Sequence, residues 1–308
     1  MLKKSFFILL GVLVFTAVFA VFRPSLIVPK SVVRKEMELP NSKYFDWKGN
    51  KIHYVDEGQG ETILMIHGFG GSHQNFQKIT EKLKDHYRVI RVDLPGFGLS
   101  DFPKEKQNYA TMYSSFIADF TTALGLDSIY VMGNSMGGGV SWVYTLDHPK
   151  QVKGLVLVDA FGYDAKSIQK HVLRATRFSV FHLALKKGLP LFLSRRAAQR
   201  CFENDDLISE KALTRTNRIW NAEGNIDALF ALASFSEFPS DENIKKIQVP
   251  TLIIWGKQDN LIPAEHAARF HHDIKNSAVV VVDHCGHVPM MEQPEKVERA
   301  FSDWEKTL

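Results

Sequence analysis

Cysteine is scarce in this chain, whose 308 residues include two, Cys201 and Cys285. They lie far apart and form no Cys-x-x-Cys pair, so the sequence carries neither a zinc-site signature nor a disulfide framework, although one disulfide between them stays open. The formal net charge of +4 is too small to indicate a nucleic-acid binder, and no zinc-finger or RNP-type signature is present. With 45% hydrophobic and 23% charged residues, the composition is that of a folded protein, not a disordered one.

The N-terminus departs from this composition. An apolar segment runs from residue 6 to residue 22 and ends at Arg23 and Pro24. A run of this length is at the short end of what crosses a hydrocarbon core of roughly 30 Å, and it exceeds the roughly 7–15 apolar residues of a signal peptide. The sequence therefore predicts a retained single-span membrane helix in residues 1–23, with signal cleavage near Ala20 as the alternative. Basic residues flank both ends of the segment, so its orientation stays open.

Strand-like and helix-like patterns alternate along most of the remaining chain, without internal repeats or low-complexity tracts. Such βαβα order predicts an α/β fold with a mostly parallel eight-stranded sheet and helices on both faces. Strands are expected at residues 44–47, 51–55, 62–66, 88–92, 128–132, 154–158, 250–255 and 278–282. Helices are expected at 72–83, 109–124 and 136–147, from Pro263, and from Pro294, the last with Val297, Phe301, Trp304 and Leu308 on one face.

The alternation breaks between residues 161 and 238. This stretch has helical but no strand-like periodicity and holds eight of the 22 phenylalanines, so we interpret it as a helical cap inserted after the sixth strand. The basic connector between the N-terminal apolar segment and the first strand shows no clear periodicity. It is expected to form a short stalk at the membrane surface. The predicted divisions are an anchor or signal segment (1–23), a connector (24–41), the first part of the core (42–160), the cap (161–238) and the second part of the core (239–308).

One serine stands where a nucleophile is expected. Ser135 lies in the sequence Gly-Asn-Ser-Met-Gly at 133–137, between a buried strand and a helix. In a G-x-S-x-G turn the flanking glycines are needed because side chains there would collide as the chain reverses. A match of five residues also arises by chance, but the strand before and the helix after it are the context of a nucleophile elbow.

A serine hydroxyl is a poor nucleophile until a positioned base takes its proton, and that base needs a third group, here an acidic side chain, to hold its tautomer. Asp259 and His287 each follow a later predicted strand, and carboxyl ends of parallel strands meet at one edge of a sheet. We therefore predict a catalytic triad of Ser135, Asp259 and His287. Asp159 is an alternative acid, and His284 an alternative base.

The negative charge that forms during acyl transfer needs hydrogen-bond donors. We expect the backbone N–H groups of Met136 and Phe69 to supply them, the latter from the glycine-rich loop at 67–71. No Gly-Lys-Ser/Thr follows that loop, which argues against nucleotide binding. Neither a metal nor a cofactor is expected.

These motifs resemble, in order, those of the α/β-hydrolase superfamily. They include His-Gly-Phe-Gly at 67–70, Asp-Leu-Pro-Gly-Phe-Gly-Leu-Ser at 93–100, the serine motif, Gly-Lys-Gln-Asp at 256–259 and Gly-His-Val-Pro at 286–289. The chain looks closest to bacterial lipases and esterases related to monoacylglycerol lipases, and nearly as close to hydrolases that split carbon–carbon bonds of dienoic ring-cleavage products. The resemblance implies an ester hydrolase without a cofactor. A serine at 135, in place of aspartate, argues against dehalogenase or epoxide hydrolase activity. Residues expected near the substrate are Gly68, Asn134, Phe161 and Val288.

The predicted cap is basic over residues 165–200, where no acidic residue occurs. Leucines and phenylalanines are interleaved with the basic residues, a pattern typical of surfaces that bind anionic lipid, although a solvated helix face is an equal alternative. With the N-terminal segment, this pattern suggests a membrane-anchored esterase or lipase acting on lipid-like esters, with a carbon–carbon hydrolase as the alternative. The basic residues are Lys166, Lys170, Arg174, Arg177, Lys186, Lys187, Arg195, Arg196 and Arg200.

Overall fold

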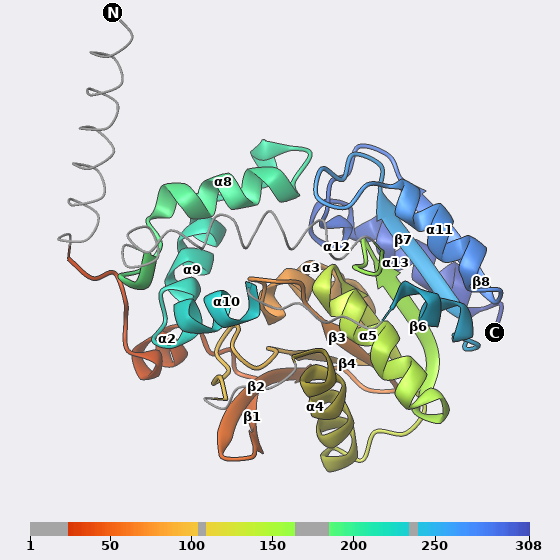
Figure 1. Cartoon of the computed structure of the whole chain (residues 1–308), viewed down its shortest axis with the longest axis horizontal. Helices are drawn as coiled ribbons and strands as arrows, with labels where there is room; N and C mark the ends of the chain where they lie inside the picture. The colour runs from red at the N-terminus through yellow and green to blue at the C-terminus, as the bar shows by residue number, and fades with distance from the viewer. Residues whose placement is uncertain (1–23, 104–108, 164–184, 234–239) are drawn as a thin grey trace, which may run out of the picture.

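A computed structural model describes residues 24–103, 109–163, 185–233 and 240–308 (Figure 1). The predicted N-terminal membrane helix in residues 1–23 lies outside these ranges. Within them, no helix combines the length and the apolar character needed to cross a bilayer.

Eight strands form one sheet in the order β1-β2-β4-β3-β5-β6-β7-β8. β2 pairs antiparallel with β1 and β4, and all the other neighbours are parallel. The expected mostly parallel eight-stranded sheet is therefore confirmed. Its strands are β1 (Ser42–Trp47), β2 (Asn50–Glu57), β3 (Glu61–Ile66), β4 (Tyr87–Val92), β5 (Ile129–Asn134), β6 (Val152–Val158), β7 (Thr251–Gly256) and β8 (Ser277–Val282).

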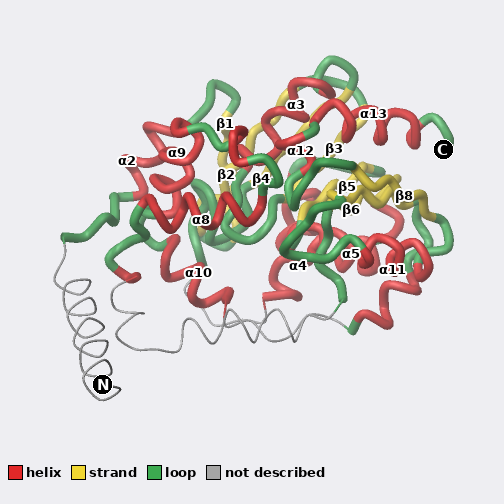
Figure 2. The backbone as a smooth tube through the Cα atoms, turned by 90° about the horizontal axis from the view of Figure 1, so that it is seen from above, coloured by secondary structure: helices red, strands yellow, loops and turns green. Residues whose placement is uncertain are grey.

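Helices cover both faces of the sheet, as predicted (Figure 2). Alternate residues of the central strands point to opposite faces, so each face builds its own apolar core. One face packs against α3 (Gln77–Leu83), α12 (Pro289–Glu292) and α13 (Pro294–Glu305), and the other against α4 (Tyr109–Ala123), α5 (Met136–Asp147) and α11 (Glu265–Asp273).

Two helix ends differ from the prediction. The helix expected at 72–83 begins as a 3-10 turn, η1 (His73–Phe76), whose start is capped by the Ser72 side chain. The last helix ends at Glu305, so Leu308 lies beyond it and is 52% exposed. The apolar face of α13 therefore stops at Trp304, because the sheet provides no further surface for Leu308 to cover.

Three further helices lie between β6 and β7 in the chain, where the cap was expected, and gather on one side of the molecule (Figure 1). They are α8 (Leu191–Cys201), α9 (Glu210–Trp220) and α10 (Asn225–Ala233), with the short turn η3 (Asp205–Leu207) after α8; the turn η4 (Asp241–Lys246) precedes β7. Residues 164–184 and 234–239 of the predicted cap lie outside the described residues.

The connector expected at 24–41 is not an irregular stalk. It contains α2 (Lys30–Met37), which packs beside α9 (Figure 1). Val33 is wholly buried in a small apolar cluster with Leu99 and Ile219. The apolar face of this single short helix was too brief to be seen as periodic, and its partners come from distant parts of the chain.

Candidate active site

Ser135 occupies a strained turn between β5 and α5. Its φ is +55°, in the left-handed region that side chains other than glycine rarely adopt. A Cβ atom at Gly133 would collide with Gly137 and Ser141, and one at Gly137 would collide with the carbonyl of Ile66. Both glycines are therefore required for the sharp reversal, which leaves the serine partly exposed at the carboxyl edge of the sheet.

Asp259 and His287 are brought together at the same edge. Asp259 follows β7, His287 follows β8, and Asp259 Oδ2 lies 2.6 Å from His287 Nδ1. The other carboxylate oxygen accepts the N–H groups of Leu261 at 2.7 Å and Ile262 at 3.0 Å, which fixes the carboxylate in place. With Nδ1 engaged, Nε2 is the ring nitrogen left for a substrate or for a serine hydroxyl.

Asn134 joins the serine turn to the histidine loop. Its buried amide donates to the carbonyls of Val158 and His287, each at 3.1 Å. No hydrogen bond joins Ser135 Oγ to His287 within the described part of the chain. Such contacts are often long in unliganded enzymes and tighten in the substrate complex.

The four residues expected near the substrate have different positions. Both amide hydrogens of Asn134 are used between loops, and Val288 is 5% exposed within the core under α3. The N–H of Phe161 donates to the Ser135 carbonyl at 2.9 Å. Gly68 packs against the serine side chain, because a Cβ atom there would lie 2.9 Å from Ser135 Cβ. Asn134 and Val288 therefore support the loops, while Gly68 and Phe161 adjoin the serine.

The alternative acid and base lie in different environments. Asp159, at the end of β6, is fully buried and accepts the N–H of Gly256 at 2.9 Å. Burial, and next the charge of Asp259, raise the pKa of Asp159 well above its usual range, which favours its uncharged form. His284 is exposed, and no acid contacts its ring among the described residues. Asp259 is thus the carboxylate that holds His287.

The loop expected to bind the oxyanion packs directly on the serine turn. The N–H of Gly71 donates to the Gly68 carbonyl at 3.0 Å, which closes a tight turn around the 45% exposed Phe69. Met136 begins α5, where the first N–H groups of a helix have no intrahelical partner. Trp220 of α9 also contacts this loop, because its indole N–H donates to the Gly70 carbonyl, and the sequence did not predict it there. No local pattern marks this contact between cap and loop.

Cys201 and Cys285 are both free thiols, so no disulfide joins them. Cys201 ends α8, and its carbonyl accepts the N–H of His287 at 2.7 Å. The backbone at Cys201, and not its sulfur, therefore belongs to the surroundings of the histidine.

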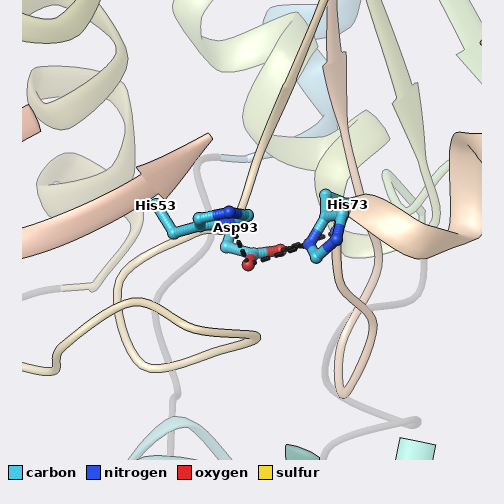
Figure 3. A group of neighbouring side chains, drawn as sticks. All are labelled: His53, His73 and Asp93. Carbon is cyan, nitrogen blue, oxygen red and sulfur yellow. Dashed lines mark hydrogen bonds and ion pairs between the residues drawn. The ribbon is translucent and has the colours of Figure 1, made fainter. Parts of the chain in front are cut away.

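A second acid–histidine cluster lies at the end of β4 (Figure 3). The Oδ2 atom of Asp93 is 2.8 Å from His53 Nδ1 and 3.1 Å from His73 Nδ1, and all three side chains are fully buried. Asp93 also accepts the backbone N–H groups of His73 at 2.6 Å and Leu99 at 2.9 Å. Burial alone would raise the pKa of Asp93, but His73 and the hydrogen bonds from both imidazoles lower it well below its usual range.

This cluster has residue types that bind metals, but most of its polar atoms already bond to one another or to neighbouring groups, and His73 Nε2 is left without a hydrogen-bond partner among the described residues. Both carboxylate oxygens of Asp93 accept several N–H groups, and the remaining nitrogen of His53 lies 2.7 Å from Ser42 Oγ. The cluster is therefore a hydrogen-bonded junction that holds the loop at 93–100 to β2 and η1.

The comparisons with known proteins agree with this geometry. A family model described as alpha/beta hydrolase fold matches residues 61–294. Lipase 1 of Psychrobacter immobilis is 31% identical over 256 residues, covering 79% of this chain and 77% of that protein. The 2-hydroxy-6-oxononadienedioate/2-hydroxy-6-oxononatrienedioate hydrolase 2 of Pseudomonas putida is 28% identical over 267 residues, covering 82% of this chain and 91% of that protein.

A solved structure is also similar. The thermophilic esterase from Thermogutta terrifontis superposes with a TM-score of 0.73 at 25% identity, covering 86% of this chain and 98% of the esterase. Fold, strand order and sequence similarity agree, and the chain belongs to the α/β-hydrolase family.

Proposed function

We propose that this protein is a serine hydrolase that cleaves lipid-like carboxylic esters with Ser135, His287 and Asp259. The observation that carries the proposal is the 2.6 Å contact between Asp259 and His287, at the same sheet edge as the strained turn of Ser135. Asp259 holds the imidazole so that Nε2 can act as the base, which is the arrangement that serine nucleophiles need.

In the proposed reaction, Ser135 Oγ attacks the ester carbonyl carbon while His287 Nε2 takes the hydroxyl proton. The N–H groups of Met136 and Phe69 donate to the oxygen that becomes negatively charged. His287 then gives the proton to the leaving alcohol as the carbon–oxygen bond breaks, which leaves an acyl group on Ser135. Water, activated by the same histidine, releases the acid and restores the serine.

The class of reaction rests on the relatives as well as on the site. Similarity to lipases and to an esterase makes the chain a carboxylic ester hydrolase. The carbon–carbon hydrolase of Pseudomonas putida at 28% identity keeps a second candidate open, because such an enzyme is expected to use the same triad. The predicted anchor and the basic cap favour an ester substrate that is lipid-like.

We infer that the enzyme is membrane-bound and single-pass, and the surface of α8 suits contact with a membrane. Phe192, Arg196 and Arg200 lie four residues apart on its exposed side, and Phe192 is 60% exposed. α8 contains no acidic residue. An aromatic and basic face of this kind suits the boundary between anionic headgroups and acyl chains. Arg195 is less available, because it pairs with Glu210.

The first described residues come from the same region. The N–H of Leu26 donates to the carbonyl of Lys187 at 2.7 Å, close to the start of α8. Leu26, which follows the apolar segment by four residues in the sequence, therefore lies close to the start of α8. We infer that the cap side of the molecule faces the lipid.

The decisive test is the Ser135→Ala variant, because it removes the nucleophile. We expect loss of p-nitrophenyl ester turnover and of fluorophosphonate labelling, while Ser302→Ala on α13 keeps both. Labelling that persists in Ser135→Ala would contradict the proposal. Turnover of a dienoic ketoacid by the wild type, without hydrolysis of any ester from acetyl to long acyl, would favour the carbon–carbon hydrolase.

A further inference from the structure

The loop that carries His287 is attached to the cap as well as to the core. The backbone N–H of His287 donates to the carbonyl of Cys201, the last residue of α8, at 2.7 Å. On the core side, Asn134 donates to the His287 carbonyl at 3.1 Å. The histidine is therefore held between two parts of the protein that are distant in sequence.

One buried carboxylate completes the attachment to the cap. Glu292, at the end of α12, is 8% exposed. Its Oε1 atom accepts the N–H of Gly286 at 2.8 Å, immediately before His287. Its Oε2 atom accepts the N–H groups of Glu203 at 2.9 Å and Asn204 at 3.3 Å, in the turn that follows α8.

This attachment tolerates little movement. A Cβ atom at Gly286 would collide with the carbonyl of Cys201 and would lie 2.8 Å from Glu203 N and 3.0 Å from Glu292 Oε1. The backbone beside His287 is thus in direct contact with the end of α8. A shift of that end would displace the histidine loop, because no free space separates them.

Without its hydrogen-bond partners, the Glu292 carboxylate would destabilise the folded protein at this buried position. Burial raises the pKa of Glu292, although the N–H groups of Gly286, Asn204 and Glu203 lower it. A buried carboxylate that loses hydrogen bonds is destabilised by more than the bonds themselves contribute. Glu292 therefore favours the arrangement in which the histidine loop and the end of α8 stay together.

We propose that Glu292 is a positioning residue, whose carboxylate joins the histidine loop to the end of α8 and so makes the place of His287 depend on the cap. The inference rests on the proposed function, in which His287 is the base. α8 begins at Leu191 and Phe192 on the proposed lipid-facing surface and ends at Cys201 beside the histidine loop. One helix therefore connects that surface with the catalytic base.

The test is Glu292→Gln in the full-length chain, assayed with a soluble short-chain p-nitrophenyl ester. The amide keeps the size of the side chain but accepts at one oxygen only, so either the N–H of Gly286 or those of Glu203 and Asn204 lose their acceptor. Since a displacement of about 1 Å can lower a rate about 100-fold, we expect kcat to fall about 10- to 100-fold with KM nearly unchanged. The rate of fluorophosphonate labelling should fall in parallel, because labelling needs the same base.

The controls separate a positioning role from simple loss of folded protein. Glu295→Gln makes the same substitution three residues away, at an exposed side chain that pairs with Lys82, and should keep the wild-type kcat. The number of active sites in each sample is counted by labelling with fluorophosphonate to completion, and each rate is divided by that number. If Glu292→Gln does not fold, Glu292→Asp tests the same role, because it keeps the charge but is one methylene too short to reach both Gly286 and the turn after α8, and kcat should again fall.

A wild-type kcat per labelled site in Glu292→Gln would overturn the inference, as would a loss confined to KM. The proposed function is tested separately by Ser135→Ala. If that variant is inactive while Glu292→Gln is fully active, the triad stands and the positioning role fails. If Ser135→Ala keeps its activity, the proposed function itself fails.

Discussion

Two aspartates near the active site have the same chemistry and different environments. Asp259 accepts the N–H groups of Leu261 and Ile262 and contacts His287. Asp159 accepts one N–H, from Gly256, and its pKa is raised by burial and by the neighbouring carboxylate. A carboxylate can stabilise the imidazolium formed during catalysis, whereas a neutral acid cannot. The roles of the two residues therefore follow from their surroundings.

We expect Asp259→Asn to lower kcat/KM about 1,000- to 10,000-fold, because the amide leaves the imidazole without an anionic partner. Asp159→Asn should cost less than about tenfold, since asparagine is uncharged like the neutral acid and keeps an oxygen for the Gly256 N–H. Both variants are measured with the same p-nitrophenyl ester. Equal losses in the two variants, or a larger loss in Asp159→Asn, would contradict the assignment.

At the scale of the elements, the end of β4 depends on buried groups that titrate. Burial lowers the pKa of both His67 and His73, although the charge of Asp93 opposes this. Each imidazole therefore takes up a proton less readily in the folded protein than in the unfolded chain. His73 contacts Asp93, and His67 Nε2 accepts the N–H of Leu94 at 3.0 Å, so both hold the loop that follows β4.

Acid should therefore destabilise the protein. Below a pH of about 6.5 the unfolded chain takes up protons at these histidines more readily than the folded protein does, so the free energy of unfolding falls as the pH drops. We expect Tm to be lower at pH 5.5 than at pH 7.5. In His73→Gln the Tm should be lower at both values, with a smaller decrease between them.

The matched control is His271→Gln, at an exposed position on α11. It should show the same decrease in Tm between the two pH values as the wild type. An equal decrease in His73→Gln and the wild type would mean that His73 does not contribute to the acid sensitivity.

At the scale of the whole molecule, residues 24–41, which precede β1, contact both the cap and the core. The N–H of Val28 donates to the carbonyl of Asn221 at 2.8 Å, beside the last turn of α9. Lys30 is buried, and its Nζ atom donates to the carbonyl of Ser100 at 2.6 Å and to the side chain of Asn225. Val28 and Lys30 therefore contact the cap, and α2 lies beside α9 (Figure 1).

If the cap side faces lipid, the exposed surface of α8 should bind anionic vesicles. In a chain that begins at residue 24, we expect Phe192→Ala with Arg196→Glu and Arg200→Glu to weaken binding to phosphatidylglycerol-containing vesicles by about tenfold or more. Each basic residue near an anionic surface contributes about 1 kcal/mol. Binding is measured by co-sedimentation at fixed ionic strength.

The control for net charge is Arg299→Glu with Lys306→Glu, two exposed positions, one on α13 and one directly after it. α13 lies away from α8 in the molecule (Figure 1). This variant has the same two charge reversals and should bind vesicles nearly as the wild type does. Equal weakening in both variants would show that total charge, and not the surface of α8, governs binding.

Much of the core was predictable because it depends on local patterns. Buried strands such as β3 and β5 are short apolar runs, and the glycines around Ser135 mark a turn that few sequences can make. The order of the strands implied that the loops carrying Asp259 and His287 would meet at one edge. The structure places these two side chains in contact, and their catalytic roles remain a prediction.

The attachments between cap and core required the tertiary structure. Three of these contacts join residues that are far apart in the chain. Trp220 contacts the loop of Gly70, Glu292 contacts the turn after α8, and α2 packs against α9. Periodicity shows which residues are buried, but a hydrogen bond to a distant backbone group leaves no pattern in the sequence. The sequence by itself determined the sheet and the chemistry brought to its edge, because these follow from the spacing of apolar residues and glycines. Only the folded chain decided which of two aspartates meets the histidine and what holds that histidine in place, because both depend on burial and on directed bonds.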